Sequence, residues 1–403
     1  MGNYPADWKW RTLGSCATVK ARIGWQGLTT AEYLKDGDHY LVNGVNIENG
    51  QVNWQTCFMV DEKRYAQDKN IQLQNFDVLV SKDGTIGKVA YVENMPRTAT
   101  LNSGVFVIRS VDAELSQEYL ARVFLSTWFD DFIKKITAGS TIVHLYQKDI
   151  VQFSFQIPPL SEQKRIADVL SNADKLIANV EKRIAKKRAI KQGAMQELLT
   201  GKKRLSGFEG EWERKRLGDN ATMFAGGTPS TNIAEYYGGG IPWVSISDIS
   251  LAGKYISSTS STLTELGLNN SSAKWYPPNT LLFAMYASIG KCCIAQAKTT
   301  SSQAILGICN LVDIDLEFLY YILTFRNLEF LTMGQTGTQS NLSKAIVESI
   351  VIETPTLAEQ RAIANVLGDM DAEIANLERK LEKLKLMKQG MMQDLLTGKV
   401  RLK

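Results

Sequence analysis

The sequence predicts a mixed α/β (α+β) protein with an internal pseudo-twofold repeat, in which two globular domains alternate with two long helices. Three observations predict this class: a gap-free repeat late in each half of the chain, a heptad-like apolar pattern within it, and short matching motifs between the copies. The predicted globular domains are residues 1–155 and 206–352, and the repeated helical segments are residues 156–205 and 353–403.

The repeat is the strongest signal in the chain. Residues 162–205 match residues 359–402 at a constant offset of 197, with 24 identities in 44 positions and no gap. Both copies begin with Glu-Gln and close with Leu-Leu-Thr-Gly-Lys. Agreement over this length does not arise by chance, so the two halves of the chain are expected to share one architecture.

Each copy has the pattern of a single long helix. Pro159 and Pro355 precede the copies and Gly201 and Gly398 end them, and Ser161 is the expected N-cap of the first helix. A helix of about 39 residues spans about 58 Å. Apolar residues recur at spacings of three and four, which predicts an antiparallel coiled coil with a globular domain at either end. These residues are Ile166, Val169, Leu170, Ala173, Leu176, Ile177, Val180 and Ile184, then Ile363, Val366, Leu367, Met370, Ile374, Leu377, Leu381 and Leu384.

The two globular segments share short motifs and diverge between them. The motifs are β-branched and punctuated by glycine, which predicts mixed domains with β-hairpins. The matching pairs are Trp8–Gly14 with Trp212–Gly218, Tyr40–Ile47 with Pro242–Ile249, and Thr85–Lys88 with Ser288–Lys291. Two domains that recognise different ligands are expected to share a fold and to differ in their surface residues.

Composition excludes several classes of protein. The 403 residues contain no apolar stretch long enough to span a membrane, and the N-terminus lacks the pattern of a signal peptide, so a cytoplasmic location is expected. The five cysteines are odd in number and none forms a Cys-x-x-Cys pair, which predicts buried free thiols. With only two histidines, no metal site is expected.

Charge is unevenly distributed along the chain. The net charge is +4, but residues 181–204 carry nine Lys/Arg against two Glu, and residues 378–403 carry eight against three acidic residues. Two interpretations remain open: the lysines cover a solvated helix face, or they attract a polyanion or an acidic partner surface.

In combination, these motifs resemble the specificity subunits of type I restriction-modification systems, across essentially the whole chain. The resemblance rests on Pro158–Gln163 with Ile166-Ala167, on Gln196–Gly201, and on their second copies at Glu359-Gln360 and Leu396–Gly398. It rests also on Gly226–Ser230 followed by Gly240–Ser245.

The resemblance implies two target-recognition domains, each reading half of a split sequence in double-stranded DNA. It implies as partners two methyltransferase subunits and two restriction subunits that are motor nucleases. No cofactor is expected in this chain, because S-adenosylmethionine, ATP and magnesium would be bound by those partners. The helix pair would act as a ruler for the unread spacer, since major-groove faces recur every ~34 Å along DNA.

Candidate DNA contacts are polar residues that interrupt strand-like runs, together with residues beside glycine turns, which let a backbone approach phosphate. In the first domain they are Lys20, Arg22, Trp25, Gln26, Asn43, Asn46, Lys82, Thr85, Lys88, Ser140, Thr141 and His144. In the second domain they are Thr228, Ser230, Ser245, Asp248, Ser288, Lys291, Gln303, Thr338, Gln339 and Asn341. For each residue alone, an ordinary surface or turn position is the competing interpretation.

Lys88 and Lys291 are favoured, because they occupy matching places in otherwise divergent domains. We expect both to bind phosphates. His144 corresponds to Asn341, and since both side chains can donate and accept hydrogen bonds, the pair suits base recognition but not shared acid–base catalysis.

No catalytic motif is found, so a non-catalytic chain is expected. Gly84–Val89 has too few residues between its glycines for a phosphate-binding P-loop and lacks a hydroxyl after Lys88. No Asn/Asp-Pro-Pro-Tyr stretch of an amino-methyltransferase is present, because Asn279 follows Pro277-Pro278. Two other interpretations stay open: the reader subunit of a fused nuclease-methyltransferase, and a structural coiled-coil protein with no role on DNA.

Overall fold

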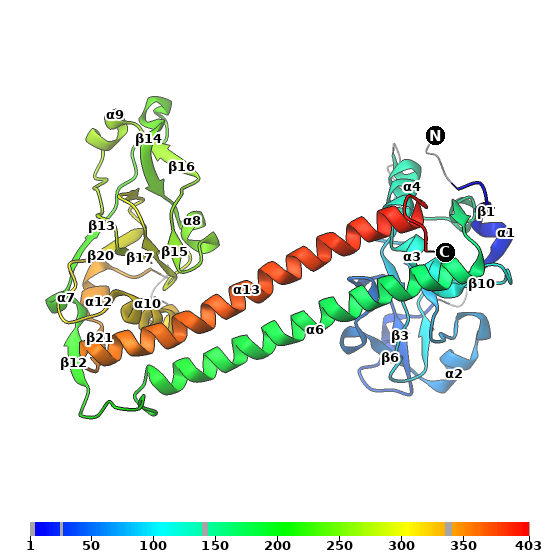
Figure 1. Ribbon diagram of the computed structural model, residues 1–403, viewed down its shortest axis with the longest axis horizontal. Coiled ribbons are helices and arrows are strands. Elements are labelled where there is room, and N and C mark those ends of the chain that lie inside the picture. Colours follow the sequence, from blue (N-terminus) through cyan, green and yellow to red (C-terminus); the bar gives the residue numbers. More distant parts are fainter. Residues whose placement is uncertain (1–4, 25–26, 139–143, 335–340, 403) are drawn as a thin grey trace. The chain divides into compact units, whose positions relative to one another are not determined.

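A computed structural model describes residues 5–24, 27–138, 144–334 and 341–402. The chain forms two compact units, unit 1 (Met1–Glu181 with Arg379–Lys403) and unit 2 (Lys182–Glu378). Each unit therefore combines one globular domain with a segment of each long helix (Figure 1). Among the described residues, no helix is both long and apolar enough to cross a membrane.

The two long helices are α6 (Leu160–Leu198) and α13 (Leu357–Leu396). Both end as predicted, because Gly201 (φ +68°) and Gly398 (φ +70°) adopt the left-handed conformation that ends a helix. The predicted start is wrong in one detail. Ser161 lies inside α6, and the carbonyl of Pro159 accepts the N–H groups of Glu162 and Gln163 at 2.9 and 3.1 Å.

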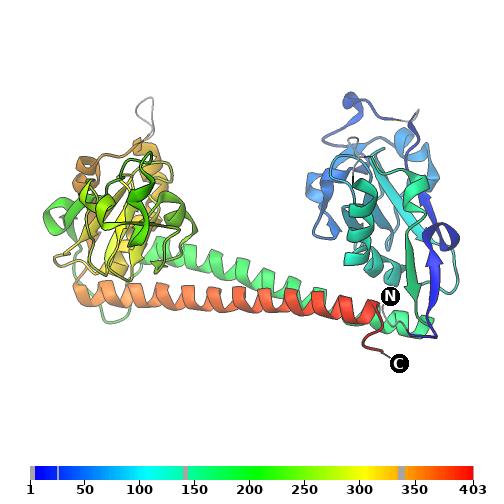
Figure 2. The same ribbon diagram turned by 90° about the horizontal axis from the view of Figure 1, so that it is seen from above.

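Within each unit the two helix segments lie side by side and antiparallel (Figure 2). In unit 1, Asp174 pairs with Lys388 at 2.5 Å and Glu181 with Lys385 at 2.9 Å. Unit 2 repeats these pairs with the partners exchanged between helices, as Asp371–Lys191 at 2.5 Å and Glu378–Arg188 at 2.5 Å. Part of the basic charge on the helices is thus neutralised by the neighbouring helix, which neither interpretation of the sequence included.

The apolar seam is narrower than its pattern predicts. Ile166, Leu170 and Ile184 are buried, but Val169 is 36% exposed and Leu176 is 55% exposed. The reason is that a two-helix contact covers only a narrow stripe on each helix, and the globular domain covers only the helix ends.

The sheets of unit 1 are antiparallel apart from one parallel pairing, β3 with β9. The four-stranded sheet has the order β2 (Ala17–Lys20), β10 (Val105–Ser110), β7 (Val78–Ser81), β8 (Val89–Tyr91). A second sheet has the order β6 (Phe58–Val60), β3 (His39–Val42), β9 (Ala99–Leu101), and two pairs are β1 (Lys9–Thr12) with β11 (Ser154–Ile157) and β4 (Ile47–Glu48) with β5 (Gln51–Val52).

The short helices of unit 1 cap and cover these sheets. The α-helices are α1 (Leu13–Cys16), α2 (Glu62–Ala66), α3 (Gln117–Phe124), α4 (Thr127–Thr137) and α5 (Gln147–Ile150). The 3-10 helices are η2 (Thr30–Glu32), η3 (Gly44–Asn46), η4 (Trp54–Thr56) and η5 (Lys69–Ile71).

Unit 2 repeats the main sheet, the second sheet and the β1–β11 pair; it adds one strand to the main sheet, and its described residues form no pair equivalent to β4–β5. The main sheet has the order β13 (Thr222–Ala225), β20 (Ile305–Cys309), β17 (Thr280–Ala284), β18 (Cys292–Ala295), β15 (Tyr255–Ile256). The second sheet has the order β16 (Ser261–Leu263), β14 (Tyr237–Val244), β19 (Thr300–Ser301), and β12 (Glu213–Arg216) pairs with β21 (Val351–Thr354). The helices are α7 (Leu217–Asn220), η6 (Ala234–Tyr236), α8 (Ile246–Leu251), α9 (Glu265–Asn269), α10 (Leu316–Phe325), α11 (Asn327–Gly334) and α12 (Lys344–Ser349).

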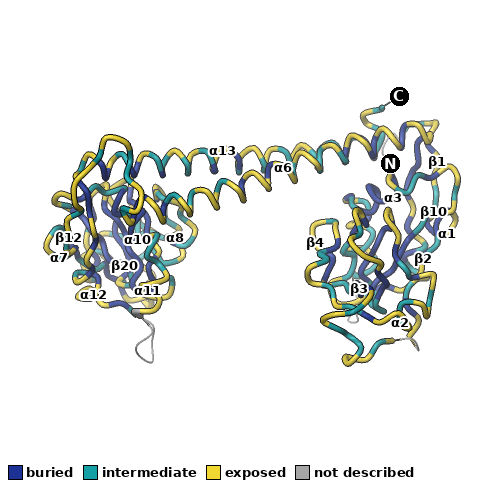
Figure 3. The backbone as a smooth tube through the Cα atoms, turned by 90° about the horizontal axis from the view of Figure 1, so that it is seen from below, coloured by how far each residue is buried: buried dark blue, intermediate teal, exposed yellow. Residues whose placement is uncertain are grey.

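Each main core combines a sheet with the beginning of one long helix and the end of the other. In unit 1, Ile166 and Leu395 join the core of β2, β7 and β10. In unit 2, Ile363 and Leu198, which stand at the same repeat positions, join the core of β13, β17 and β20. Figure 3 shows β2 and β10 in the buried interior of unit 1 and β20 in that of unit 2. This packing explains why the repeat spans the whole helix, because the two ends of each long helix pack into the cores of different units.

Candidate nucleic-acid interface

Two hairpins, β7–β8 in unit 1 and β17–β18 in unit 2, close with the same backbone geometry. Ser81 N–H donates to the Lys88 carbonyl at 2.9 Å, and Ala284 N–H donates to the Lys291 carbonyl at 2.9 Å. Residue Gly87 (φ +79°) corresponds to Gly290 (φ +80°). The motif pair predicted from the sequence is therefore a conformational match.

The tip of the second hairpin is strained. Gly84 has φ +68° at the first tip, and its counterpart Ala287 has φ +57°. An L-residue with a Cβ costs about 1–2 kcal/mol in this region. Backbone strain of this kind gathers at functional positions, which supports a binding role for the hairpin tip.

A segment from later in each domain lies against each hairpin. Leu145 N–H donates to the Lys82 carbonyl at 2.9 Å, and Leu342 N–H donates to the Met285 carbonyl at 2.9 Å. These bonds bring His144 and Asn341, the residues just before them, beside the two hairpins. The predicted correspondence of His144 with Asn341 thus describes one shared place in the fold.

In unit 1 the hairpin tip and this segment are joined by one side-chain contact. Asp83 contacts Nδ1 of His144, and the two side chains are 45% and 30% exposed. The ring of Tyr146, which is 51% exposed, lies 4.5 Å from that of His144, and Lys148 Nζ lies 5.5 Å from the Tyr146 ring. This cluster offers hydrogen-bond acceptors, a cation and an aromatic edge to a ligand.

The tip of the β17–β18 hairpin in unit 2 has the same backbone geometry but different side chains. Tyr286, 38% exposed, stands where unit 1 has Asp83. Ser288 shares a hydrogen bond of 2.9 Å with Ser250. Asp83, Tyr146 and Tyr286 were missed by sequence reasoning, although aligning the two hairpins residue by residue would have found Asp83 and Tyr286.

The two matched lysines follow the tips and stand immediately before the return strands β8 and β18. Lys88 is half-buried and Lys291 is exposed. Lys82, on the other side of the first tip, lies 5.4 Å over the ring of Phe106. Lys20 is exposed at the end of β2. These cations are placed where a phosphate could reach them.

Three predicted contact residues are instead structural, because their side chains are buried and bonded inside the domain. Arg22 is 2% exposed, and its Nε donates to the Leu101 carbonyl at 2.8 Å. Asn46 is 1% exposed and accepts the N–H of Asn43 at 2.8 Å. Asp248 is 9% exposed and accepts the N–H of Ser245 at 2.8 Å.

The last two bonds each belong to a capping box. The box of Asn46 follows strand β3 in unit 1, and the box of Asp248 follows strand β14 in unit 2. Burial acts to raise the pKa of Asp248, but hydrogen bonds from Ser245 and Ser260 hold that pKa below its usual value. The match of Asn43 and Asn46 with Ser245 and Asp248 therefore reflects local folding.

The other predicted residues divide into surface positions and positions outside the described residues. Exposed or half-buried are Thr85, Thr228, Ser230 and Gln303. Outside the described residues lie Trp25, Gln26, Ser140, Thr141, Thr338 and Gln339.

An acidic residue in the first turn of each long helix anchors that helix through an ion pair. Glu162 is 2% exposed and receives Arg401 Nε at 2.8 Å. The bond from Arg401 holds the pKa of Glu162 below its usual value. Arg204 Nε donates to Glu359 at 2.6 Å in unit 2, with the roles of the helices exchanged.

Gln163 completes the anchor by bonding to a loop of the globular domain. Its Nε2 donates to the Glu114 carbonyl at 2.7 Å, and its Oε1 accepts the N–H of Ser116 at 2.8 Å. Gln360 makes the equivalent bonds to Asp313 at 3.2 Å and Asp315 at 2.8 Å.

Metal ligands and thiols are the remaining groups that could carry chemistry. Within the part of the chain that the structure describes, no group of three or more His, Cys, Asp and Glu side chains is placed to hold a metal ion. Burial raises the pKa of Cys292 and of Cys293 to about 12, so both thiols are protonated at neutral pH.

Comparison with known proteins identifies the family. Residues 5–187 and 209–386 match the family model described as type I restriction modification DNA specificity domain. The putative type I restriction enzyme MjaX specificity subunit of Methanocaldococcus jannaschii is 26% identical, over 100% of this chain and 96% of that protein.

Solved structures show the same fold. The type I restriction-modification S subunit from M. genitalium aligns with a TM-score of 0.62 at 14% identity, over 98% of this chain and 97% of that one. A chain from a study of complex assembly and conformational transition of the type I R-M system aligns with a TM-score of 0.61 at 18% identity, over 99% and 100%. The chain therefore belongs to the type I restriction modification DNA specificity domain family.

Proposed function

We propose that this chain is the DNA-recognition subunit of a type I restriction-modification complex, and that each unit reads one half of a bipartite target. The family match over both globular domains carries the proposal. It is supported by the two hairpins, which have the same backbone geometry but carry different side chains at their exposed tips.

The geometry suggests that different residues of each unit contact the phosphates and the bases. Lys88 and Lys291 bind phosphate and fix the register of the hairpin on the duplex, since phosphate contacts position a protein without reading sequence. The tip residues, Asp83 with His144 in unit 1 and Tyr286 with Asn341 in unit 2, face base edges. Different side chains at equivalent places give the two half-sites different sequences.

The chemistry of modification and cleavage belongs to partners in this proposal. Two methyltransferase subunits supply methyl transfer from S-adenosylmethionine, and two restriction subunits supply ATP- and magnesium-dependent translocation and cleavage. This chain holds them to a chosen sequence and is itself non-catalytic.

Genome-wide methylation mapping tests the proposal, in cells with and without the gene for this chain. We expect a bipartite methylated motif that disappears with the gene. An unchanged methylation pattern, from a strain in which the methyltransferase subunit is expressed, would contradict the proposal.

A further inference from the structure

Each unit presents one exposed tyrosine beside its hairpin tip. Tyr146 in unit 1 is 51% exposed, and Tyr286 in unit 2 is 38% exposed. The two tyrosines do not correspond in sequence, because the residue of unit 2 that matches Tyr146 is Ser343 and the residue of unit 1 that matches Tyr286 is Asp83. The two units therefore carry an exposed phenol ring on different segments.

One hydrogen bond relates the positions of the two rings. In each unit a backbone bond of 2.9 Å joins the later segment to the hairpin, and we call this bond the junction. In unit 1 Tyr146 directly follows the donor, Leu145, and in unit 2 Tyr286 directly follows the acceptor, Met285. A tyrosine thus stands at the junction in both units, although the segment that supplies it is exchanged.

A side chain that both units place at the junction suits a task that both half-sites share. This inference rests on the proposed function, in which two methyltransferase subunits modify one split target, so each half-site must release one base to a methyltransferase. A methyltransferase cannot reach its target atom inside a duplex and acts on a base that has left the stack. Proteins that unstack DNA commonly hold the opened base step with a side chain.

We propose that Tyr146 and Tyr286 stack on the bases that remain when the methylated base of each half-site leaves the duplex. A tyrosine ring has only two side-chain dihedral angles to fix, and every base has a face on which it can stack. Stacking is therefore tolerant of sequence and suits two half-sites that differ. Each tyrosine is a positioning residue, and methyl transfer itself belongs to the partner subunit.

The groups around each ring fix its place and favour DNA as its ligand. The centroids of the Tyr146 and His144 rings lie 4.5 Å apart with an angle of 61° between the rings, so His144 supports Tyr146 from one side. Lys148 Nζ lies 5.5 Å from the Tyr146 ring and supplies positive charge for a nearby phosphate. In unit 2 the strained residue Ala287, with φ +57°, directly follows Tyr286 and sets the direction of the chain at the tip.

The rate of methyl transfer in each half-site tests the inference. It is measured in a single turnover by the full chain in complex with its cognate methyltransferase subunit, on a duplex that carries both half-sites. Tyr146→Ala should slow methyl transfer in one half-site by about 5- to 150-fold, the range expected for loss of one stacking contact. Tyr286→Ala should do the same in the other half-site.

Two further measurements separate stacking from other roles of the tyrosines. Mispairing the methylated base should restore much of the rate in both alanine variants, because a mispaired base leaves the stack more easily. Tyr146→Phe and Tyr286→Phe should keep the wild-type rate, because phenylalanine retains the ring. Tyr146→Ala should also leave the sequence of the methylated motif unchanged.

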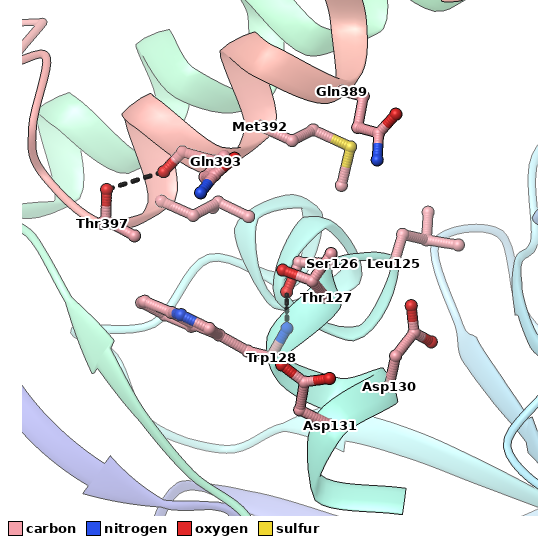
Figure 4. Close-up of a pocket in the computed structure, with 11 residues that line it drawn as sticks. Leu125, Ser126, Thr127, Trp128, Asp130, Asp131, Gln389, Met392, Gln393 and Thr397 are labelled. Atoms are coloured by element: carbon pink, nitrogen blue, oxygen red, sulfur yellow. Dashed lines mark hydrogen bonds between the residues drawn. The ribbon is translucent and has the colours of Figure 1, made fainter. Parts of the chain in front are cut away.

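Trp128 provides the control, because it is an aromatic residue of unit 1 outside the hairpin tip. It lines a cavity of about 390 Å³ between the start of α4 and the end of α13, opposite Met392 and Gln393 (Figure 4). Among the described residues that line this cavity, none belongs to the tip 82–88 or to the segment 144–148. Any slowing caused by Trp128→Ala should therefore be equal for paired and mispaired duplexes.

A wild-type rate for both alanine variants on the paired duplex would overturn the inference. So would a loss that mispairing does not restore, which would assign the rings to DNA binding alone, or an equal loss in the phenylalanine variants, which would assign the contact to the hydroxyl group. A changed motif in Tyr146→Ala would assign that ring to base reading. A wild-type complex that methylates no bipartite duplex would overturn the proposed function itself.

Discussion

Arg401, from the segment after α13, forms a bidentate ion pair with Glu162 at the start of α6, with Nε–Oε1 and Nη2–Oε2 distances of 2.8 Å. The carboxylate is buried, with 3% of its side chain exposed, and Arg401 also contacts Asp7 at 2.7 Å. In unit 2 the same pair is Arg204 with Glu359. Each globular domain is thus fastened to the end of one helix and the beginning of the other by one repeated interaction.

Loss of this arginine should destabilise unit 1. Arg401→Met leaves Glu162 buried without its partner, and removal of one member of a buried pair costs about 3–5 kcal/mol. We expect the loss of unfolding free energy to lie near the lower end of this range, because the side chain of Arg401 is 20% exposed. Urea unfolding followed by fluorescence measures the change.

Lys134→Ala is the control for that measurement, since its pair with Asp131 is 76% and 71% exposed and should contribute less than about 1 kcal/mol. Equal effects of the two substitutions would contradict an anchoring role for Arg401.

Protonation of Glu162 should lower the stability of the protein in acid. Its folded-state pKa is lowered, first by the bond from Arg401. The stabilisation is therefore complete above the unfolded-state pKa of about 4.3 and is lost as the pH falls below it toward the folded-state pKa. Unfolding free energies between pH 6 and pH 3 measure the slope.

The variant Glu162→Gln removes the titrating group. We expect a shallower fall of stability with acid in this variant than in the wild type. Parallel curves for the two proteins would show that other carboxylates dominate the acid transition.

Lys88 and Lys291 should contribute to DNA affinity without contributing to sequence preference. Each alanine variant should weaken binding to target and non-target duplexes alike, and should reduce the slope of log K against log salt by about one. Fluorescence anisotropy at several salt concentrations measures both quantities. Unchanged slopes would rule out phosphate contacts.

Arg22 and Lys20 lie close in sequence and should behave oppositely. Arg22→Ala leaves the Leu101 carbonyl without its buried donor, which should cost about 1–3 kcal/mol of folding free energy. Lys20→Ala, at an exposed position, should leave stability within about 0.5 kcal/mol. Thermal unfolding of both variants decides whether Arg22 is structural; equal midpoints would contradict that role.

Asp83 should determine part of one half-site. A carboxylate accepts a hydrogen bond from the exocyclic amine of cytosine or adenine in the major groove. Asp83→Ala should therefore relax base preference in one half of the methylated motif and leave the other half unchanged. Sequencing of the methylated motif measures this, and relaxation of both halves would indicate a general loss of structure instead.

The repeat, the two long helices, their glycine ends and the correspondence of the hairpins can all be predicted from the sequence. These features depend on patterns that a local segment or a repeat carries within itself: apolar spacing, proline and glycine positions, and identical residues at an offset of 197. The correspondence of Lys88 with Lys291 is visible in the matching motifs Thr85–Lys88 and Ser288–Lys291, and that of His144 with Asn341 in the offset of 197.

The burial of individual polar residues and the sharing of a core between segments follow from the three-dimensional packing and cannot be predicted from local patterns. Arg22, Asn46 and Asp248 have the composition of DNA contacts, but burial depends on neighbours distant in sequence, such as Leu101 for Arg22. The anchoring role of Glu162 is not visible in the sequence, because its partner, Arg401, lies 239 residues away. Likewise, a periodic apolar pattern shows that a helix has a buried side, whereas the division of each helix between two units follows from packing in three dimensions.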